Sequence, residues 1–330
     1  MGDSPLAVGD TGSLSLEQIS KALNAGFSGY FVPVNFTADS LAAFCRQYGI
    51  DLSQSLVVVP RSGEERGPAG VTLLGLREDR GWCGGFGIVP EYRGTGASRL
   101  LLDALVERCR ELELSSLQLE VLTQNERAIK LYERRGFHRR RELVVLRGDA
   151  RMVLGQIAQA EQDSATPARA SGDTEGRHVR RLSPAEVVAL MVGGRWGATH
   201  PPSWQRDWAT LLNLTGIRGL VCESSAGAVG ALLYQAKAGT SQINIGALAF
   251  SDPAAGHALL AHAYNDYKAS VPDVENTGLA DAASTGSNSA NSKDHFFILN
   301  EPEGSPVLEM LTGLGMSAVA RQYEMVLPLR

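Results

Sequence analysis

The amino-acid sequence predicts an α/β (α+β) fold arranged as two tandem domains, and three observations support this prediction. The chain has 330 residues, which is long for one domain and comfortable for two. Apolar residues recur at helical spacing in some segments and alternate with polar residues in others, so helices and strands follow one another. Residues 131–146 and 310–327 share the spacing of a short helix, a glycine and an apolar strand. This similarity indicates a duplicated domain.

The first domain is predicted at residues 1–149. It opens with a small, polar and Gly-rich stretch over residues 1–14, which is expected to be poorly ordered at first. Two helices follow at residues 15–27 and 37–48, and then three strands at 55–60, 70–76 and 82–89, of which the first two form a hairpin. A helix at 97–112, a strand at 117–121 and a helix at 125–136 come next. The domain ends with two short strands at 137–139 and 142–147. Gly84 and Gly85 indicate a bulge or a close backbone approach within the strand at 82–89.

A second domain is predicted at residues 178–330, after a linker at 150–177. Residues 150–162 of this linker could continue as a helix, and from residue 163 onward it is small and polar. Its elements are expected in an order like that of the first domain, at residues 184–192, 219–222, 228–234, 243–250, 253–267, 296–299, 305–314 and 322–327. A flexible insertion is predicted at about residues 271–294, which are rich in Gly, Ser, Asn and Ala.

Composition excludes several classes of protein. Apolar residues make up 44% of the chain and charged residues 20%, as in an ordinary soluble protein. The formal net charge of −5 argues against nucleic-acid binding. Neither a signal peptide nor an apolar segment of about 18 residues is visible, so a cytoplasmic protein without a membrane span is expected. The four scattered cysteines are expected to be reduced and buried, and they and the histidines lack metal-ligand spacing, so no metal is expected.

The segment that organises the first domain is residues 86–102, FGIVPEYRGTGASRLLL. An apolar strand ends at Pro90, a turn with Gly94 and Gly96 follows, and a helix begins directly after the turn. Backbone N–H groups at a helix start have no partner inside the helix and can bind an anion. The glycines allow close backbone approach, and Arg93 adds a positive charge suited to phosphate. These residues predict a phosphate site, with a plain tight turn as the alternative.

Two motifs resemble those of the GNAT family of acyl-CoA-dependent N-acetyltransferases. They are Val89-Pro90-x-x-Arg93-Gly94-x-Gly96 and Asn125-x-x-Ala128-x-x-x-Tyr132-x-x-x-Gly136-Phe137, in the family's order and separated by a strand. The resemblance covers residues 52–147 well and is much weaker over 178–330. It implies two tandem GNAT-like folds, each a mixed, mostly antiparallel sheet flanked by helices, with acetyl-CoA as cofactor.

The resemblance also implies a role for each residue that matches a motif. The turn from Arg93 to Ser98 matches the pyrophosphate loop, although Ser98 stands where the family usually has Gly or Ala. The main chain of the strand end matches the groups that pair with the pantetheine arm, Asn125 matches a contact to that arm, and Tyr132 matches the usual general acid. The residues expected to bind the cofactor are Ile88, Val89, Arg93, Gly94, Thr95, Gly96, Ala97, Ser98, Asn125 and Tyr132.

The chemistry of acetyl transfer suits these residue types. The reaction needs a neutral amine and a proton for the departing thiolate. The Tyr132 hydroxyl, with an ordinary pKa of about 10, can protonate a thiolate of pKa roughly 8.5. Glu120 is the candidate base, acting directly or through water. Each residue also has a structural alternative: Asn125 as a helix cap, Tyr132 as a core aromatic, and Glu120 as a solvated or structurally paired carboxylate.

The second domain departs from the family pattern at the functional positions. Residues 251–256, SDPAAG, replace the Arg-Gly-x-Gly turn and bring a carboxylate to it, and Leu311 stands at the position equivalent to Tyr132. Weak or no binding of acetyl-CoA is therefore predicted there.

The sequence thus predicts an N-acetyltransferase that moves an acetyl group from acetyl-CoA to a primary amine of a small molecule or a protein, with no nucleic-acid or membrane partner. The chain is expected to be a monomer with an internal pseudo-dimer, or a homodimer. A non-catalytic acyl-CoA-binding or regulatory module is the rival interpretation. A Rossmann site would need further spaced glycines, and a P-loop would need Gly-Lys-Ser/Thr.

Overall fold

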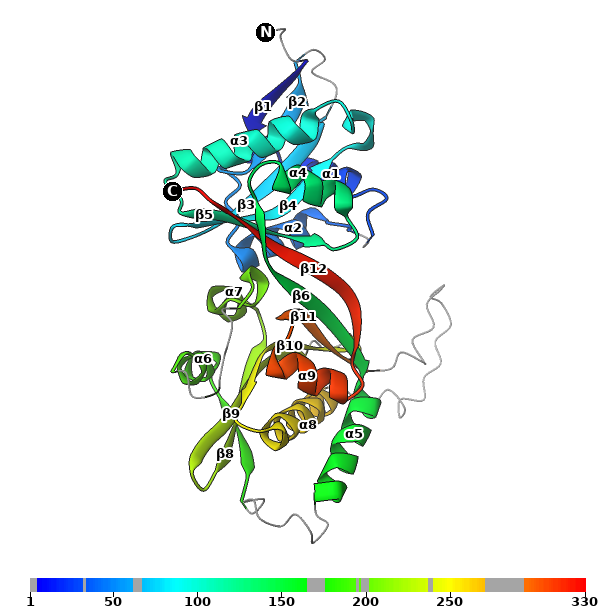
Figure 1. Ribbon diagram of the computed structural model, residues 1–330, viewed down its shortest axis with the longest axis vertical. Helices are drawn as coiled ribbons and strands as arrows, with labels where there is room; N and C mark the ends of the chain where they lie inside the picture. Colours follow the sequence, from blue (N-terminus) through cyan, green and yellow to red (C-terminus); the bar gives the residue numbers. More distant parts are fainter. Residues whose placement is uncertain are drawn as a thin grey trace, which may run out of the picture. The chain divides into compact units, whose positions relative to one another are not determined.

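The chain folds into two compact units (Figure 1). The computed structural model describes residues 5–31, 34–61, 67–164, 176–193, 196, 202–236, 240–270 and 294–330. Unit 1 comprises residues 1–142 together with Gln322–Arg330, and unit 2 comprises Leu143–Arg321. The predicted insertion at 271–294 lies outside the described residues, apart from Asp294.

Unit 1 is built on a mixed, mostly antiparallel sheet. Its strands lie in the order β1 (Leu6–Asp10), β2 (Leu56–Pro60), β3 (Gly70–Arg77), β4 (Arg80–Ile88), β5 (Ser116–Leu122) and the last part of β12 (Ser317–Pro328). Neighbouring strands are antiparallel except β4 and β5, which run parallel. Strand β1 shows that the expectation of a poorly ordered stretch is wrong for Leu6–Asp10, because Leu6 is buried and the strand pairs with β2 along its length.

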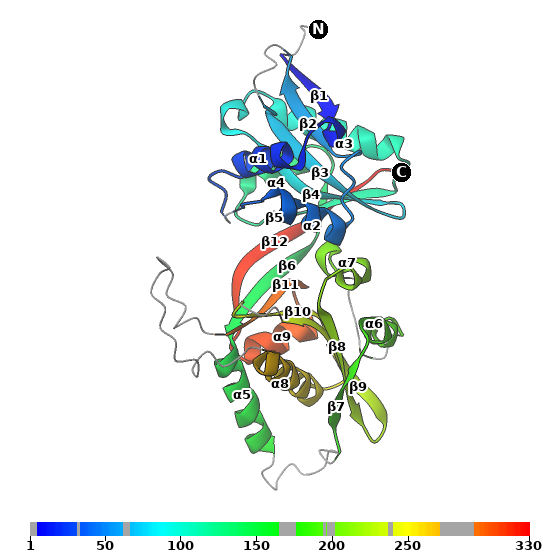
Figure 2. The same cartoon turned by 180° about the vertical axis from the view of Figure 1, so that it is seen from behind.

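Helices cover both faces of this sheet (Figures 1 and 2). The α3 (Ala97–Glu111) and α4 (Glu126–Glu133) helices lie on one face, and α1 (Leu16–Gly26) and α2 (Ala38–Tyr48) lie on the other. Leu101 and Leu105 of α3 pack into the core of the first face, whereas Leu23 and Leu41 pack into the core of the second. The short 3₁₀ helices are η1 (Thr11–Ser13) and η2 (Pro90–Tyr92).

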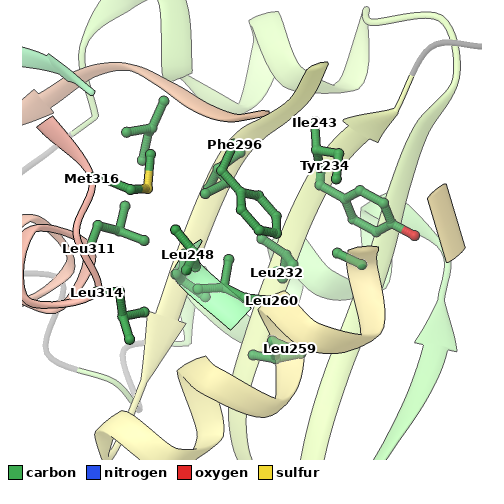
Figure 3. Close-up of a cluster of buried hydrophobic side chains, with 14 of the residues drawn as sticks. Leu232, Tyr234, Ile243, Leu248, Leu259, Leu260, Phe296, Leu311, Leu314 and Met316 are labelled. Carbon is green, nitrogen blue, oxygen red and sulfur yellow. The ribbon is translucent and has the colours of Figure 1, made fainter. Parts of the chain in front are cut away.

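Unit 2 repeats this arrangement. Its strands lie in the order β6 (His138–Asp149, from Leu143 onward), β11 (His295–Pro302), β10 (Gln242–Phe250), β9 (Gly227–Ala236), β8 (Ile217–Ser224) and β7 (His178–Leu182), with β10 and β11 as the parallel pair. One face packs against α5 (Ala150–Ser164), α8 (Pro253–Ser270) and α9 (Pro306–Gly313), and the other against α6 (Pro184–Val192) and α7 (Trp208–Leu212), which follows η4 (Trp204–Arg206). Figure 3 shows the larger of these cores, in which Phe296 and Leu232 of the strands face Leu259 and Leu260 of α8.

In each unit, the strand beside the parallel pair comes from the other half of the sequence. Gln322–Pro328 of β12 pair with β5 in unit 1, and Leu143–Asp149 of β6 pair with β11 in unit 2. The compact units therefore differ from the predicted domains at 1–149 and 178–330, because a strand belongs to the sheet whose hydrogen bonds it completes.

A further difference concerns the segment that follows α4. The two short strands expected at 137–139 and 142–147 are one strand, β6, because the four residues 139–142 include no Gly or Pro to interrupt it. The helix that the sequence allows at residues 150–162 is present as α5, whose Val153 and Ile157 are buried in the core of unit 2. The four cysteines are free and buried, as predicted.

The C-terminal strand should contribute directly to the stability of unit 1. Met325 of β12 is fully buried there, so Met325→Ala should leave a cavity and lower the free energy of unfolding by about 2–5 kcal/mol. Val319→Ala in the same strand changes a residue that is 57% exposed and should cost less than about 1 kcal/mol. Urea unfolding measures both, and hydrogen exchange at β5 amides locates the loss. Equal effects of the two variants would contradict this role of β12.

Candidate functional site

The two parallel strands of unit 1 pair over only part of their length. Arg80–Trp82 of β4 pair with Ser116–Gln118 of β5, although the strands continue to Ile88 and Leu122. Beyond this point, the backbone groups on the facing edges of β4 and β5 are not joined to each other. The edge of β4 is therefore available to another extended molecule.

The predicted bulge in β4 is confirmed where this pairing ends. Leu73 of β3 pairs with Gly85 and Leu74 pairs with Cys83, so Gly84 is the extra residue. A Cβ at Gly84 would lie 2.4 Å from the Trp82 ring, so a side chain there would displace that ring.

The turn after β4 has the backbone that the sequence predicts for an anion site. Gly94 and Gly96 have φ angles of +85° and +95°, which other L-residues adopt only with strain. Gly96 caps α3 without a side-chain hydrogen bond, and Ala97, the first helical residue, is fully buried. Within the described chain, the N–H groups of Gly96, Ala97 and Ser98 have no acceptor. These donors and the positive end of α3 can bind an anion.

The Arg93 side chain binds backbone carbonyls. Its Nε donates to the Ile88 carbonyl at 3.0 Å, and its Nη2 donates to the carbonyls of Gly26 at 3.0 Å and Ser28 at 2.9 Å. Gly26 can reach this position because the end of α1 touches β4, where a Cβ on Gly26 would lie 2.7 Å from the Gly87 Cα. Arg93 therefore holds the end of α1, the end of β4 and the turn together, and its predicted contact to a cofactor is left to Nη1.

The two predicted main-chain positions at the end of β4 differ in availability. The Val89 N–H donates to the Ala69 carbonyl and the Val89 carbonyl accepts from the Tyr92 N–H, each at 2.9 Å. Because backbone groups alternate in direction along a strand, the Ile88 N–H points away from β3, toward the unpaired edge. The Ile88 N–H is therefore the better candidate for pairing with a cofactor arm.

Asn125 is a helix cap, and it also has a tyrosine neighbour that the sequence did not single out. Its side chain accepts from the Ala128 N–H at 3.2 Å at the start of α4. Burial raises the pKa of Tyr30, whereas hydrogen bonds to the Asn125 side chain and the Leu122 backbone oppose this rise. Tyr30 comes from the segment after α1, so only the fold brings it to Asn125.

Tyr132 of α4 is 7% exposed. Its ring packs edge-on against Phe86, with 6.3 Å between centroids. In the described part of the chain its hydroxyl has no hydrogen-bond partner. Burial, followed by interactions with Cys83 and Tyr30, raises the pKa of Tyr132 well above its ordinary value. The hydroxyl therefore keeps its proton at neutral pH, as a general acid requires.

Glu120 lies on the opposite face of β5 from Leu119 and Val121, which belong to the core under α3 and α4. The Trp82 Nε1 donates to Glu120 Oε2 at 2.7 Å. Burial and then the Glu120 carboxylate raise the pKa of Tyr48 to about 12. Glu120 is thus a structurally held carboxylate on the face of α1 and α2, whereas Tyr132 belongs to the face of α3 and α4.

Cys83 interacts electrostatically with both Glu120 and Tyr132. It lies in β4, where the pairing with β5 ends. Burial, with a further contribution from Glu120, raises the pKa of Cys83 to about 11, and Cys83 in turn contributes to the raised pKa of Tyr132. Its thiol is therefore protonated at neutral pH and is not a nucleophile.

Unit 2 keeps the parallel pair, but a carboxylate caps the helix that follows the first strand of this pair. Asp252 accepts from the Ala255 N–H at 3.1 Å at the start of α8 and binds Arg177 at 2.9 Å. A carboxylate therefore occupies the helix start that would bind phosphate. Leu311, at the position of Tyr132, is fully buried.

The end of the β10–β11 pairing in unit 2 is also crossed by an ion pair. Pairing stops after Ile245 and Ile298. Arg206 donates through Nε to the Gly246 carbonyl of β10 at 2.8 Å and forms a buried ion pair with Glu301 of β11. The two strands are thus joined by a side chain where those of unit 1 have free edges.

Neither a metal centre nor a membrane span is found in the described residues. No group of three or more His, Cys, Asp or Glu side chains in this part of the chain is arranged to hold a metal ion. None of its helices has the length and apolar character that crossing a membrane requires.

Comparison with known proteins agrees with this geometry. Residues 19–137 match the model of the acetyltransferase (GNAT) family. A 51-residue stretch is 43% identical to mycothiol acetyltransferase of Propionibacterium freudenreichii, and a 52-residue stretch is 42% identical to the uncharacterized N-acetyltransferase YdgE of Bacillus subtilis. Each stretch is 16% of this chain, and the matches span 16% and 33% of those two proteins.

Solved structures resemble the chain over nearly its whole length. A GCN5-related N-acetyltransferase from Sphaerobacter thermophilus superposes with a TM-score of 0.65 at 16% identity, covering 99% of this chain and 97% of that one. A tandem GNAT protein from the clavulanic acid biosynthesis pathway gives 0.61 at 13% identity, covering 98% of both chains. At such identities the likeness concerns the fold. The chain is thus a two-unit α/β protein with the fold of these tandem GNAT structures. Its match to the GNAT family model is confined to residues 19–137.

Proposed function

We propose that the protein is an N-acetyltransferase that moves an acetyl group from acetyl-CoA to a primary amine by direct transfer, and that unit 1 performs this reaction. The observation that carries the proposal is the helix start at Gly96–Ser98, with unoccupied N–H donors, placed at the end of a strand whose edge is unpaired. This combination suits a ligand with a diphosphate and an extended amide-bearing arm, as in coenzyme A.

The residues of the turn fit the diphosphate. A Cβ placed on Gly94 or Gly96 would meet nothing within 4 Å, so the glycines serve the backbone conformation and leave the surface open. The main-chain donors from Gly94 to Ser98 would hold the phosphates, and the Ile88 N–H and Asn125 would hold the arm. Arg93 would keep the turn in place through its three carbonyl contacts.

Tyr132 is the proposed general acid. When bound, acetyl-CoA supplies an acetyl thioester whose leaving group is a thiolate. The Tyr132 hydroxyl would give its proton to that thiolate. The raised pKa of Tyr132 keeps the hydroxyl protonated through the neutral range, and its lack of a hydrogen-bond partner among the described residues leaves the proton available.

Glu120 is the proposed base. Its carboxylate would accept a proton from the incoming ammonium group, directly or through a water molecule, which makes the amine a nucleophile. The Trp82 N–H holds one carboxylate oxygen in place. The rings of Phe44, Tyr48 and Trp82 are packed together beside it, with centroids 4.6–6.3 Å apart, and aromatic faces also favour a cationic acceptor.

Unit 2 is proposed to be a degenerate copy that does not bind acetyl-CoA. Asp252 at the start of α8 would repel a diphosphate, and the Arg206–Glu301 ion pair already joins the strands at the equivalent place.

The proposed activity is tested by measuring release of free thiol from acetyl-CoA across a panel of primary amines that includes polyamines, amino sugars, amino acids and peptides with free N-termini. Thiol release that depends on one class of amine, with a product heavier by one acetyl group, is the expected result. Saturable binding of acetyl-CoA without transfer to any amine would favour the rival interpretation, a non-catalytic acyl-CoA-binding module.

The role of Tyr132 is tested by Tyr132→Phe. Removal of the acid should reduce kcat by about 10²- to 10⁴-fold, whereas the Kd for acetyl-CoA should change little because the ring is retained. Tyr323→Phe removes a hydroxyl from another ring of unit 1, one that stacks against Arg139 at 4.4 Å, and should leave kcat unchanged. Steady-state kinetics and calorimetric titration measure both quantities. Unchanged turnover in Tyr132→Phe would remove Tyr132 as the acid.

A further inference from the structure

The C-terminal strand brings a second carboxylate next to Glu120. In the antiparallel pairing of β5 with β12, Glu120 lies directly opposite Glu324. Directly opposed residues of two antiparallel strands point to the same face, with Cβ atoms about 4.5–5.5 Å apart. Glu324 therefore faces the same side of the sheet as the proposed base.

Glu324 is fully buried and ion-paired. Its carboxylate accepts a hydrogen bond from Arg141 Nη2 of β6 at 3.0 Å, and the ion pairs place Arg141 Nε 2.8 Å and Arg140 Nε 3.6 Å from Glu324 Oε2. The Arg141 side chain is only 13% exposed. Like charges directly opposite each other in a sheet repel, so Arg141 offsets the charge that Glu324 brings to Glu120.

Other groups contact Glu120 from neighbouring elements. Tyr48 of α2 and Cys83 of β4 both interact with the Glu120 carboxylate and are neutral at neutral pH, since their pKa values are raised to about 12 and 11. Trp82 donates a neutral hydrogen bond. Arg77 of β3 acts on Tyr48 as an opposing positive charge. Glu324 with Arg141 is a buried ion pair on the strand next to Glu120.

We propose that Glu324 and Arg141 are positioning residues that set the proton affinity of the base Glu120. The proposal rests on the function proposed above. Glu324 raises the proton affinity of Glu120 by repulsion and Arg141 lowers it by attraction, so the proton affinity of the base depends on both neighbouring charges. The C-terminal strand, supplied by the last residues of the chain, would thereby complete the acceptor side of the site in unit 1.

The test is the pH profile of kcat/KM for four variants. Glu120→Gln should remove the acidic limb together with most of the turnover. Glu324→Gln should move the limb to lower pH and Arg141→Gln to higher pH, each by roughly one pH unit, because the two changes alter the neighbouring charge in opposite directions. Arg141→Lys keeps the positive charge and should leave the limb close to its original position.

The outcomes separate the two proposals. If Glu120→Gln removes the limb but Glu324→Gln and Arg141→Gln leave it in place or move it in the same direction, the positioning role is wrong and the base assignment stands. If Glu120→Gln keeps the limb, Glu120 is not the base and both proposals fail. A general loss of stability cannot move the acidic limb in opposite directions in Glu324→Gln and Arg141→Gln. Thermal unfolding of each variant measures any such loss of stability. If Arg141→Gln does not fold, the other two variants test the positioning role. The role then requires that the acidic limb of the pH profile moves to lower pH in Glu324→Gln and stays in place in Arg141→Lys.

Discussion

The end of pairing between β4 and β5 is the constraint on which the rest of unit 1 depends. Gly84 is the extra residue of the β-bulge at this point. The close approach of Gly26 to Gly87 brings the end of α1 against β4. Arg93 then joins α1, β4 and the turn through three carbonyl contacts. The same turn starts α3 with its donors unoccupied. A helix start with N–H groups that have no acceptor in the described chain therefore lies next to an unpaired strand edge.

The two units share this architecture but differ in what fills it. In unit 2 the parallel pair ends in the same way, yet Asp252 caps the helix that follows β10 and Arg206 joins the two strands through Gly246 and Glu301. In unit 2, protein side chains thus bind backbone groups at the helix start and at the strand end. In the described part of unit 1, the corresponding backbone N–H groups at the helix start have no acceptor. A buried ion pair stabilises little by itself, and here it joins β10 to β11 through Arg206.

Much of the fold and part of the candidate site follow from sequence. The glycine turn, the Asn125 cap, the bulge at Gly84 and the carboxylate at the helix start of unit 2 all depend on local residue types, which a sequence displays directly. The exchange of β6 and β12 between the units does not, because strand partners are chosen by long-range hydrogen bonding. For the same reason Tyr30, Trp82 and Glu324, which meet Asn125 and Glu120 only in the fold, carried no sequence signal. The contacts of Arg93 with carbonyls were equally hidden, since a guanidinium suits both phosphate and carbonyl oxygen.

The central claim is that the chain has one site for acetyl-CoA and that the turn at Gly96 forms it. Calorimetric titration of the full chain with acetyl-CoA tests this most directly, with Gly96→Ala and Gly304→Ala as a matched pair. Both glycines have positive φ angles, +95° and +75°, and open space around them, so both alanines carry similar backbone strain. The account predicts one site per chain, weakened about ten-fold or more by Gly96→Ala and unchanged by Gly304→Ala. Two equivalent sites, or equal binding by the two variants, would contradict it.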